Sequence, residues 1–413
     1  MKVVHLVPAM EQGGVETVVL ALNRVVVGSG WENVVVSKGG RLVERLVADG
    51  GRHVTLDVKS KNPLTYFWRA WKLRKLLKAE KPDLVCAHSR VPAWLFVGAR
   101  KIESLVRRIK QSNHPNNRTI EQSFTPWITY AHGANSVSRY SEVMTKGDLT
   151  VTPSRFLADY LKANYGLAEE KIRVISPAVD SNRFDPAKLD LAFVEEKRRA
   201  WGIGPNDFVV MAVGRITEVK GYDTLIKAVR LLQSNNQTIK QSDNLKLVIV
   251  GDADEGHLEY LASLKRLAEA EGRETGDVRR EARGRETEDV RRTVVFAGGE
   301  TKIPECLSIA SVVVSSNTRK PESFGLSMAE ALMMGRPVVA KAFGGALDIV
   351  RDGCDGVLVP VDAADTVAAF ADAIAKVRFG AFARLRETAL CRFDFGVMDA
   401  KTTKLYQTML REL

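Results

Sequence analysis

Long apolar segments and closely spaced cysteines are both missing from this 413-residue sequence. No run of about 20 apolar residues occurs, so the sequence predicts no membrane-spanning helix. The opening MKVVHLVPAMEQGG holds a short apolar stretch broken by Pro8, a pattern typical of a first strand and not of a signal peptide. The four cysteines are far apart and lack metal-ligand spacing, which predicts reduced thiols in a cytoplasmic protein: Cys86, Cys306, Cys354 and Cys391.

Positive charge is concentrated in the first half of the chain. The formal net charge is +11, and residues 1–180 hold 27 Lys and Arg against 16 Asp and Glu, whereas the remainder holds 34 of each. An anionic partner is therefore expected at the first half. The densest segment, 61–81, predicts a helix with one apolar face formed by Leu64, Phe67, Trp68 and Trp71. Periodicity leaves two interpretations open, contact with an anionic membrane or packing of the aromatic face on the protein's own sheet.

Apolar segments rich in Val and Ile alternate with helical segments along the chain. One series runs KVVHLV, NVVVS, HVTLDV, PDLVCAH, WITYAHG, LTVTPS and KIRVIS, and a second follows Pro186 as DFVVMAVG, LKLVIVGD, TVVFAGG, SVVVSS, PVVAKA and GVLVP. Strands this apolar are buried on both faces, which calls for parallel sheets covered by helices. We predict an α/β fold of two Rossmann-like doubly wound domains, at 1–180 and 181–395, and a final helix over 396–413 that crosses back to the first domain.

Three polar segments interrupt this pattern, at about 109–123, 232–243 and 272–292. The first two share a theme, NNRTIEQS against NNQTIKQS, and GRETGDVRR recurs as GRETEDVRR in the third. Loops tolerate such insertions at small entropic cost, so no chemistry is assigned to them. Arginine is nearly balanced by acidic residues in the third segment, which argues against nucleic acid as a partner.

The most specific signal is PESFGLSMAEALMMGRPVVA, at 321–340, directly after the strand SVVVSS. If Leu326–Met334 is helical, Glu322 lies in the loop before the helix and Glu330 about one turn inside it. The backbone N–H groups of Phe324, Gly325 and Leu326 then stand free at the helix start, where a diphosphate can bind. The two carboxylates become hydroxyl acceptors on either side, one for a sugar and one for a ribose. The structural alternative is a capped helix with a second Glu on its solvent face.

Two cations lie on another turn that follows a strand, VGRITEVKG at 213–221. Arg215 and Lys220 can grip adjacent phosphates, one as a planar fork and one as a point charge. Charged loops are common on protein surfaces, so this signal is weak alone. Together with the glutamate segment it places cations and free amides at the carboxyl ends of strands in one sheet, where ligands bind in such folds.

The first half supplies a glycine pair and two histidines at strand ends. Gly13 and Gly14 let backbone amides approach an anion or a sugar, although the spaced third glycine of a dinucleotide site is missing. His88 and His132 close the strands in LVCAHSR and TYAHGAN. His132 can hydrogen-bond a transferring sugar, and the alternative is a histidine satisfied by a neighbouring carbonyl.

At these residues the chain resembles the retaining glycosyltransferase family 4, whose members have the GT-B fold of two Rossmann-like domains facing across a cleft. The resemblance covers nearly the whole length. It includes the Gly13–Gly14 loop, His132 in AHG, Ser154 in VTPS, VDSNRF at 179–184, Arg215, Lys220, the Glu322 to Glu330 segment, GGALDIV and GVLVP.

The resemblance implies roles for these residues as a transferase site. Glu322 binds hydroxyls of the donor sugar, Glu330 binds the ribose, and Arg215 and Lys220 neutralise the diphosphate. It also implies that the anomeric configuration is retained without a metal or other cofactor, with a UDP- or GDP-linked sugar as the substrate. No enzymic nucleophile is needed, because cations and helix amides stabilise the leaving diphosphate. His132 and the glycine loop hold donor and acceptor in register.

The acceptor side follows from a narrower resemblance. Residues 88–94 (HSRVPAW) and the AHG strand are similar to bacterial members that build lipopolysaccharide or other envelope glycans. This implies a glycan or glycolipid acceptor, with Gly14, His88 and Arg90 contacting it, at the inner face of the cytoplasmic membrane. Two alternatives stay open, a nucleotide-sugar epimerase of similar fold and a catalytically inactive partner subunit.

Overall fold

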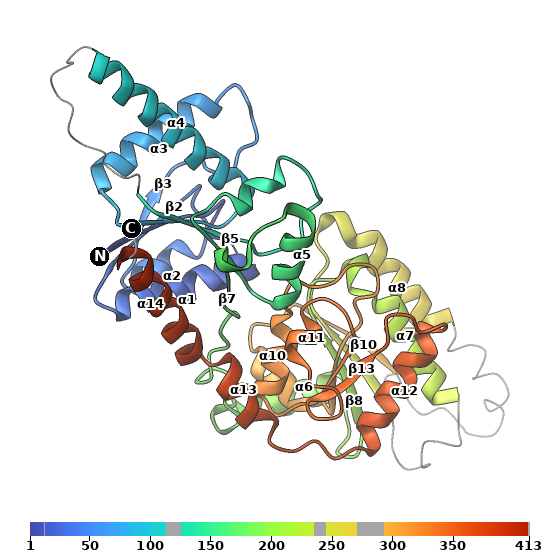
Figure 1. Ribbon diagram of the computed structural model, residues 1–413. Helices are drawn as coiled ribbons and strands as arrows, with labels where there is room; N and C mark the ends of the chain where they lie inside the picture. Colours follow the sequence, from blue (N-terminus) through green and yellow to red (C-terminus); the bar gives the residue numbers. More distant parts are fainter. Residues whose placement is uncertain (12, 113–124, 235–244, 271–292, 412–413) are drawn as a thin grey trace, which may run out of the picture. The chain divides into compact units, whose positions relative to one another are not determined.

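The chain divides into two compact units, each built around its own sheet (Figure 1). Unit 1 comprises Met1–Ala178 and Phe395–Leu413, and unit 2 comprises Val179–Asp394. The computed structural model describes residues 1–11, 13–112, 125–234, 245–270 and 293–411. The predicted polar insertions at 109–123, 232–243 and 272–292 lie largely outside the described residues. Their described parts, 109–112 and 232–234, are the ends of helices.

Unit 1 contains a parallel sheet with the strand order β3-β2-β1-β4-β5-β6-β7. The strands are β1 (Lys2–Leu6), β2 (Glu32–Ser37), β3 (Arg52–Thr55), β4 (Leu84–Ala87), β5 (Trp127–Tyr130), β6 (Leu149–Thr152) and β7 (Ile172–Val174). The chain order reverses at the β1–β4 pair, where His5 lies opposite Cys86. In sheets of this kind, ligands bind beyond the carboxyl ends of the strands at such a reversal.

Helices cover both faces of this sheet. They are α1 (Gly14–Gly28), α2 (Val43–Ala48), α3 (Tyr66–Glu80), α4 (Arg90–Ser112), α5 (Arg155–Tyr165) and α14 (Phe395–Arg411), with short 3₁₀ turns η1 (Ser141–Thr145) and η2 (Glu169–Lys171). Val4 and Leu6 of β1 pack in a core with residues of α3 and α4, whereas Val3 packs with α1 and α14 on the other face. This alternation is the two-residue period of a strand.

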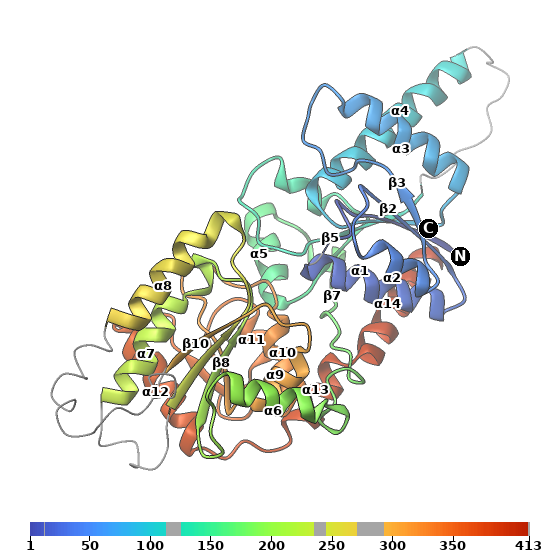
Figure 2. The same ribbon diagram turned by 180° about the vertical axis from the view of Figure 1, so that it is seen from behind.

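The helix α14 joins unit 1 from the far end of the sequence and lies beside α1 (Figure 2). Its Tyr406 is fully buried, and the Tyr406 hydroxyl lies 2.7 Å from the Tyr130 hydroxyl of β5. The Cys86 thiol donates to the same Tyr406 oxygen at 3.5 Å, and burial raises the pKa of Cys86 to about 12. Residues from both ends of the chain therefore form one core.

The packing of α3 contradicts one of the two interpretations of segment 61–81. The helix is buried through Arg69, Ala70 and Leu73, so the interpretation that its aromatic face packs on the sheet is wrong. The apolar side chains stand exposed, with exposed fractions of 90% for Leu64, 74% for Phe67, 54% for Trp68 and 40% for Trp71. Ala70, Leu73 and the Tyr66 ring pack in the core with α4, whereas the Phe67, Trp68 and Trp71 rings lie on the exposed side of the helix. No helix within the described ranges is both long and apolar enough to span a membrane.

Unit 2 contains a second parallel sheet, with the order β10-β9-β8-β11-β12-β13. Its strands are β8 (Phe208–Val213), β9 (Leu245–Val250), β10 (Val294–Gly298), β11 (Val312–Ser315), β12 (Val338–Lys341) and β13 (Gly356–Val359). Its helices are α6 (Leu191–Ala200), α7 (Tyr222–Ser234), α8 (Leu258–Ala270), α9 (Ile303–Ile309), α10 (Leu326–Met333), α11 (Ala346–Ile349), α12 (Thr366–Phe379) and α13 (Leu385–Phe393). The short 3₁₀ turns are η3 (Pro186–Lys188), η4 (Glu218–Lys220) and η5 (Glu255–His257).

Two buried cores lie on opposite faces of this sheet. One joins Val209 and Met211 of β8 to α9, α10 and α13, and the other joins Val210 and Ala212 to α7 and α12. The chain order reverses at the β8–β11 pair. The predicted cation loop follows β8 and the predicted glutamate loop follows β11, so both stand at this reversal.

Candidate functional site

The loop after β8 is held against the end of β11. Lys220 ends the 3₁₀ turn η4, and the Ser316 hydroxyl donates to the Lys220 carbonyl oxygen at 2.8 Å. Gly221 follows with φ +63°, and a Cβ there would lie 2.2 Å from the Ser316 carbonyl oxygen. Only glycine permits this approach, so the backbone of the loop fixes where the Lys220 side chain begins.

The side chain of Lys220 reaches the glutamate loop. Its ammonium group donates a hydrogen bond to Glu322 in an ion pair, with exposed fractions of 24% and 18% for the two side chains. Two residues separated by 102 positions in the sequence therefore meet at the carboxyl end of the sheet. The pair presents a cation and hydroxyl-accepting carboxylate oxygens side by side, and both remain partly accessible.

Free backbone amides lie beside this pair. The helix α10 begins at Leu326, and Gly325 precedes it with φ +113°. In the described part of the chain, the N–H groups of Phe324, Gly325 and Leu326 donate to no acceptor. The loop itself is fixed, because the Gly345 N–H donates to the Glu322 carbonyl oxygen at 2.7 Å. A helix start with unpaired amides attracts an anion.

Glu330 lies inside α10, one turn beyond the helix start. It is partly buried, and burial raises the pKa of its carboxyl group to about 7, while the positive charge of Arg183 acts in the opposite direction. The carboxylate is therefore poised to gain or lose a proton near neutral pH. No role was predicted for Arg183 from the sequence, although VDSNRF is among the segments that carry the resemblance.

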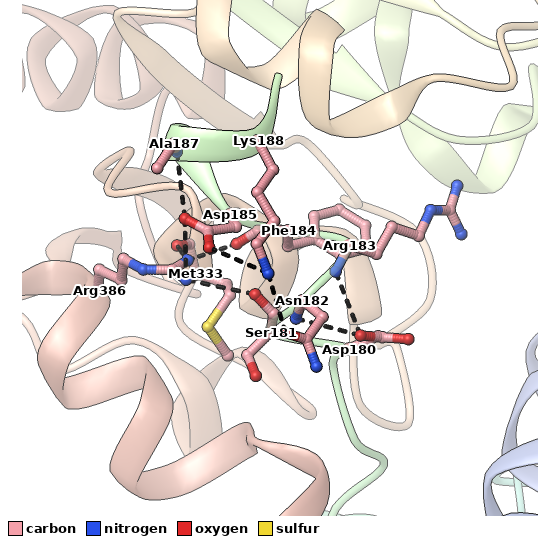
Figure 3. Close-up of polar contacts among 10 residues, drawn as sticks. All are labelled: Asp180, Ser181, Asn182, Arg183, Phe184, Asp185, Ala187, Lys188, Met333 and Arg386. Carbon is pink, nitrogen blue, oxygen red and sulfur yellow. Dashed lines mark hydrogen bonds and ion pairs between the residues drawn. The ribbon is translucent and has the colours of Figure 1, made fainter. Parts of the chain in front are cut away.

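The VDSNRF segment is an ordered turn with its own network of hydrogen bonds (Figure 3). The Asp180 carboxylate accepts the N–H groups of Asn182 at 3.1 Å and Arg183 at 3.2 Å. From α13, Arg386 donates to backbone carbonyl oxygens of this turn and to the Met333 carbonyl oxygen at the end of α10, the latter at 2.7 Å. Figure 3 shows the Arg183 guanidinium extending away from Arg386. The network thus ties the turn that carries Arg183 to the helix that carries Glu330.

Arg215 lies on the same loop as Lys220 but is exposed. Its charge contributes to lowering the pKa of Asp254, for which a hydrogen bond with His257 is the larger cause. Within the described ranges Arg215 forms no ion pair at hydrogen-bond distance. The structure therefore brings Lys220, Glu322 and the start of α10 together, and leaves Arg215 at the rim of this group. Asn317, which sequence reasoning also missed, is buried here and its Oδ1 has no partner among the described residues.

In unit 1, the predicted glycine pair stands at the start of α1. Gly13 is the N-cap with extended backbone, and Gly14 is the first helical residue. A Cβ on Gly14 would meet nothing within 4 Å, so the chain itself does not require glycine here. The open space is compatible with a ligand at these amides.

The predicted histidines meet at the carboxyl edge of the same sheet. His88 Nδ1 lies 3.0 Å from His132 Nε2, and His88 Nε2 lies 2.8 Å from Nδ1 of His5, a residue that sequence reasoning missed. Arg90 begins α4 and donates to the Ser141 hydroxyl at 3.1 Å. A histidine in the middle of the apolar strand KVVHLV was the available signal for His5. No group of three or more His, Cys, Asp or Glu within the described residues has the arrangement of a metal site.

Two family models match most of the chain. The model described as Glycosyltransferase Family 4 matches residues 12–183, and the one described as Glycosyl transferases group 1 matches residues 193–378. The chain therefore belongs to the group 1 and family 4 glycosyltransferases, which confirms the resemblance recognised in the sequence. The D-inositol 3-phosphate glycosyltransferase of Actinosynnema mirum is 30% identical over 236 residues, 57% of this chain and 50% of the relative. The chain thus spans about half the length of the curated relatives it matches.

Solved structures share the fold over the whole chain. A glycosyltransferase from Rickettsia africae ESF-5 has a TM-score of 0.79 and 22% identity, covering 100% of this chain and 99% of that one. HepE of Anabaena, in complex with UDP, has a TM-score of 0.72 and 19% identity, covering 99% and 100%. The predicted fold class is confirmed as GT-B, with two Rossmann-like parallel-sheet domains.

Proposed function

We propose that this chain is a retaining glycosyltransferase that moves a hexose from a UDP- or GDP-linked sugar to a lipid-linked glycan acceptor of the bacterial envelope. The observation that carries the proposal is the Lys220–Glu322 pair beside the unpaired amides that open α10. Cation, hydroxyl acceptor and anion-binding amides are the three groups that a sugar diphosphate requires at its scissile bond.

The chemistry is electrostatic in this proposal. Lys220 and the amides of α10 stabilise the diphosphate as it leaves, and Arg215 adds a second cation from the rim. Glu322 accepts hydroxyl groups of the hexose, and Glu330 accepts those of the ribose. No metal or other cofactor is part of the mechanism. The uridine nucleotide bound by HepE supports a UDP-linked donor.

Unit 1 supplies the acceptor side. Gly13, Gly14 and His132 hold the transferring sugar, and Gly14 and Arg90 contact the acceptor. The sequence predicted that His88 also contacts the acceptor, but His88 is buried, so in this proposal it acts through His132.

Nucleotide binding and transfer test the donor site separately. We expect UDP or GDP to raise the melting temperature of the wild type, and Lys220→Met to abolish most of this rise. Loss of one such charge also lowers turnover by a factor on the order of 10² to 10³. Lys227→Met is the matched control, since Lys227 is an exposed lysine on α7 of the same unit. Unchanged binding and turnover in Lys220→Met would refute the site.

Glu322→Gln divides the alternatives further. A transferase whose Glu322 accepts sugar hydroxyls retains nucleotide binding in this variant and loses turnover with the intact donor. Nucleotide binding by the wild type without transfer to any acceptor in a lipid extract favours the inactive partner subunit. Interconversion of two nucleotide sugars without acceptor favours the epimerase.

We further propose that α3 places the enzyme at the inner face of the cytoplasmic membrane. Lys72 and Lys75 stand over the exposed Trp68 and Trp71 rings, each with Nζ 3.8 Å from the ring centroid. Exposed rings flanked by lysine suit an anionic lipid interface, where the rings enter the headgroup boundary and the ammonium groups meet phosphates.

Vesicle sedimentation tests this contact. The double variant Trp68→Ser/Trp71→Ser is expected to lose binding to vesicles containing phosphatidylglycerol, while its melting temperature stays near that of the wild type because the rings are exposed. Phe379→Ser is the control, since Phe379 is an aromatic residue of unit 2 with an exposed fraction of 65%. Equal sedimentation of wild type and double variant would exclude α3 as the contact.

A further inference from the structure

Three histidine rings of unit 1 form a continuous chain at the reversal of its strand order. His5 lies in β1, while His88 and His132 follow β4 and β5. The nitrogen distances are 2.8 Å from His5 Nδ1 to His88 Nε2 and 3.0 Å from His88 Nδ1 to His132 Nε2. His5 and His132 therefore each contact a neighbouring histidine through one ring nitrogen, and His88 does so through both.

This row of histidines runs from the core of unit 1 to a partly exposed end. His5 is fully buried, His88 is 2% exposed and His132 is partly exposed. The His88 ring lies beside the Tyr130 ring, at a centroid distance of 4.6 Å, and beside the His132 ring, at 5.3 Å, with all three rings nearly parallel. Burial lowers the pKa of His5 to about 3 and that of His132 to about 4, so the rings are neutral at physiological pH.

Neutral rings in such a chain have coupled tautomers. A neutral imidazole carries one N–H and one bare nitrogen, so each contact needs a donor on one side and an acceptor on the other. Two arrangements satisfy both contacts. Either His5 donates to His88 and His88 donates to His132, or both hydrogen bonds run in the opposite direction.

The buried nitrogen of His5 decides which of the two arrangements is favoured. His5 Nε2 is buried and has no hydrogen-bond partner within the described part of the chain. In the first arrangement this nitrogen is bare, whereas in the second it carries an N–H with no acceptor. Buried N–H groups without acceptors are rarer than buried acceptors without donors, so the first arrangement is favoured. It leaves the proton of His132 on Nδ1, the nitrogen outside the chain.

We propose that His5 and His88 are positioning residues that hold His132 as its Nδ1–H tautomer, so that His132 acts as a hydrogen-bond donor to an oxygen atom of its ligand. Under the proposed function, that oxygen belongs to a hydroxyl group of the hexose, and for this ligand the inference rests on that function. His132 then orients the sugar and polarises its oxygen, and it does not serve as a base.

The tautomer is measurable without any substrate. In protein labelled with ¹⁵N-histidine, the shift and the ring-proton couplings of each nitrogen distinguish N–H from bare nitrogen, and His132→Gln assigns its signals among the six histidines. We expect Nδ1–H for His132 in the wild type. An Nε2–H signal for His132 would overturn the proposal.

Variants at His88 separate positioning from folding. His88→Leu removes the N–H that pairs with His132 Nε2, and we expect His132 to become a mixture of tautomers. His88→Asn places an amide N–H where Nδ1 stands and is expected to keep the single tautomer. A His132 spectrum that is the same in wild type and His88→Leu, or a mixture of tautomers in His88→Asn, would contradict the relay.

Enzyme activity provides an independent test of the relay. We expect His88→Leu to lower kcat about tenfold, equivalent to about 1.4 kcal/mol, with a much smaller effect on nucleotide affinity, and His88→Asn to keep most of the activity. An intact Nδ1–H tautomer in a protein that transfers no sugar would refute the proposed function and leave the relay standing. Full activity in a His88→Leu protein with mixed tautomers would refute the role of the relay in positioning the ligand.

Discussion

Replacement of Glu330 by Gln should stabilise the protein at alkaline pH. The free carboxyl group has an ordinary pKa of 4.5, and burial within α10 raises the pKa of Glu330 to about 7. The folded chain therefore binds more protons than the unfolded chain between these two values. Stability from this residue is fully present below pH 4.5, falls as pH rises, and is lost above about pH 7.

The size of this effect follows from the two pKa values. One pKa unit corresponds to about 1.36 kcal/mol, so the rise from 4.5 to about 7 corresponds to about 3 kcal/mol of unfolding free energy. The amide of Gln carries no charge at any pH and occupies nearly the same volume. We expect Glu330→Gln to match the wild type near pH 4.5 and to exceed it by up to about 3 kcal/mol at pH 8.

Urea unfolding followed by circular dichroism at several pH values between 4.5 and 8 measures this difference. Glu195→Gln is the control, because Glu195 is an exposed glutamate on α6 of the same unit. The reasoning would be refuted if the stability gained by Glu330→Gln were the same at every pH or equalled that of the control. Because we assign Glu330 to the ribose, the same variant should bind nucleotide more weakly at pH 8.

Two further substitutions test the loops and the terminal helix. Gly344→Ala is expected to abolish nucleotide binding, because a Cβ there would lie 2.6 Å from the Glu322 carbonyl oxygen in the loop before α10. The control is Gly353→Ala, which should keep nucleotide binding because Gly353 has a similar positive φ but no atom within 4 Å of such a Cβ. Equal loss of binding in both variants would point to backbone strain alone. Tyr406→Phe removes the hydroxyl shared with Tyr130 and should lower the unfolding free energy by about 1 kcal/mol in urea titrations. No change in Tyr406→Phe would show that this buried hydrogen bond contributes nothing net.

The parallel sheets were predictable because their strands are buried on both faces and therefore read as continuous Val- and Ile-rich segments. The candidate site was predictable as far as its loops, because loops at the carboxyl ends of neighbouring strands lie close together. The direct contact between Lys220 and Glu322 was not predictable, since it depends on how closely Gly221 approaches the end of β11.

Other features depended on packing that periodicity does not record. The aromatic face of α3 and its buried face have the same helical period, and the choice between them rests on which side chains fit against α4. His5 was hidden because one polar residue in an apolar strand carries no sign of its partner. The contact between His5 and His88 depends on the pairing of β1 with β4, two strands that are far apart in the sequence.

Unit 1 is made of two segments that are separated in the sequence by unit 2. Residues 1–178 are translated before unit 2, yet the sheet face around Tyr130 and Cys86 is covered by α14, which is translated after unit 2. Unit 2 is contiguous in sequence and emerges complete before that segment is translated. The later-made unit can thus finish folding first, and a nascent chain arrested before residue 395 leaves an apolar surface of the earlier one uncovered.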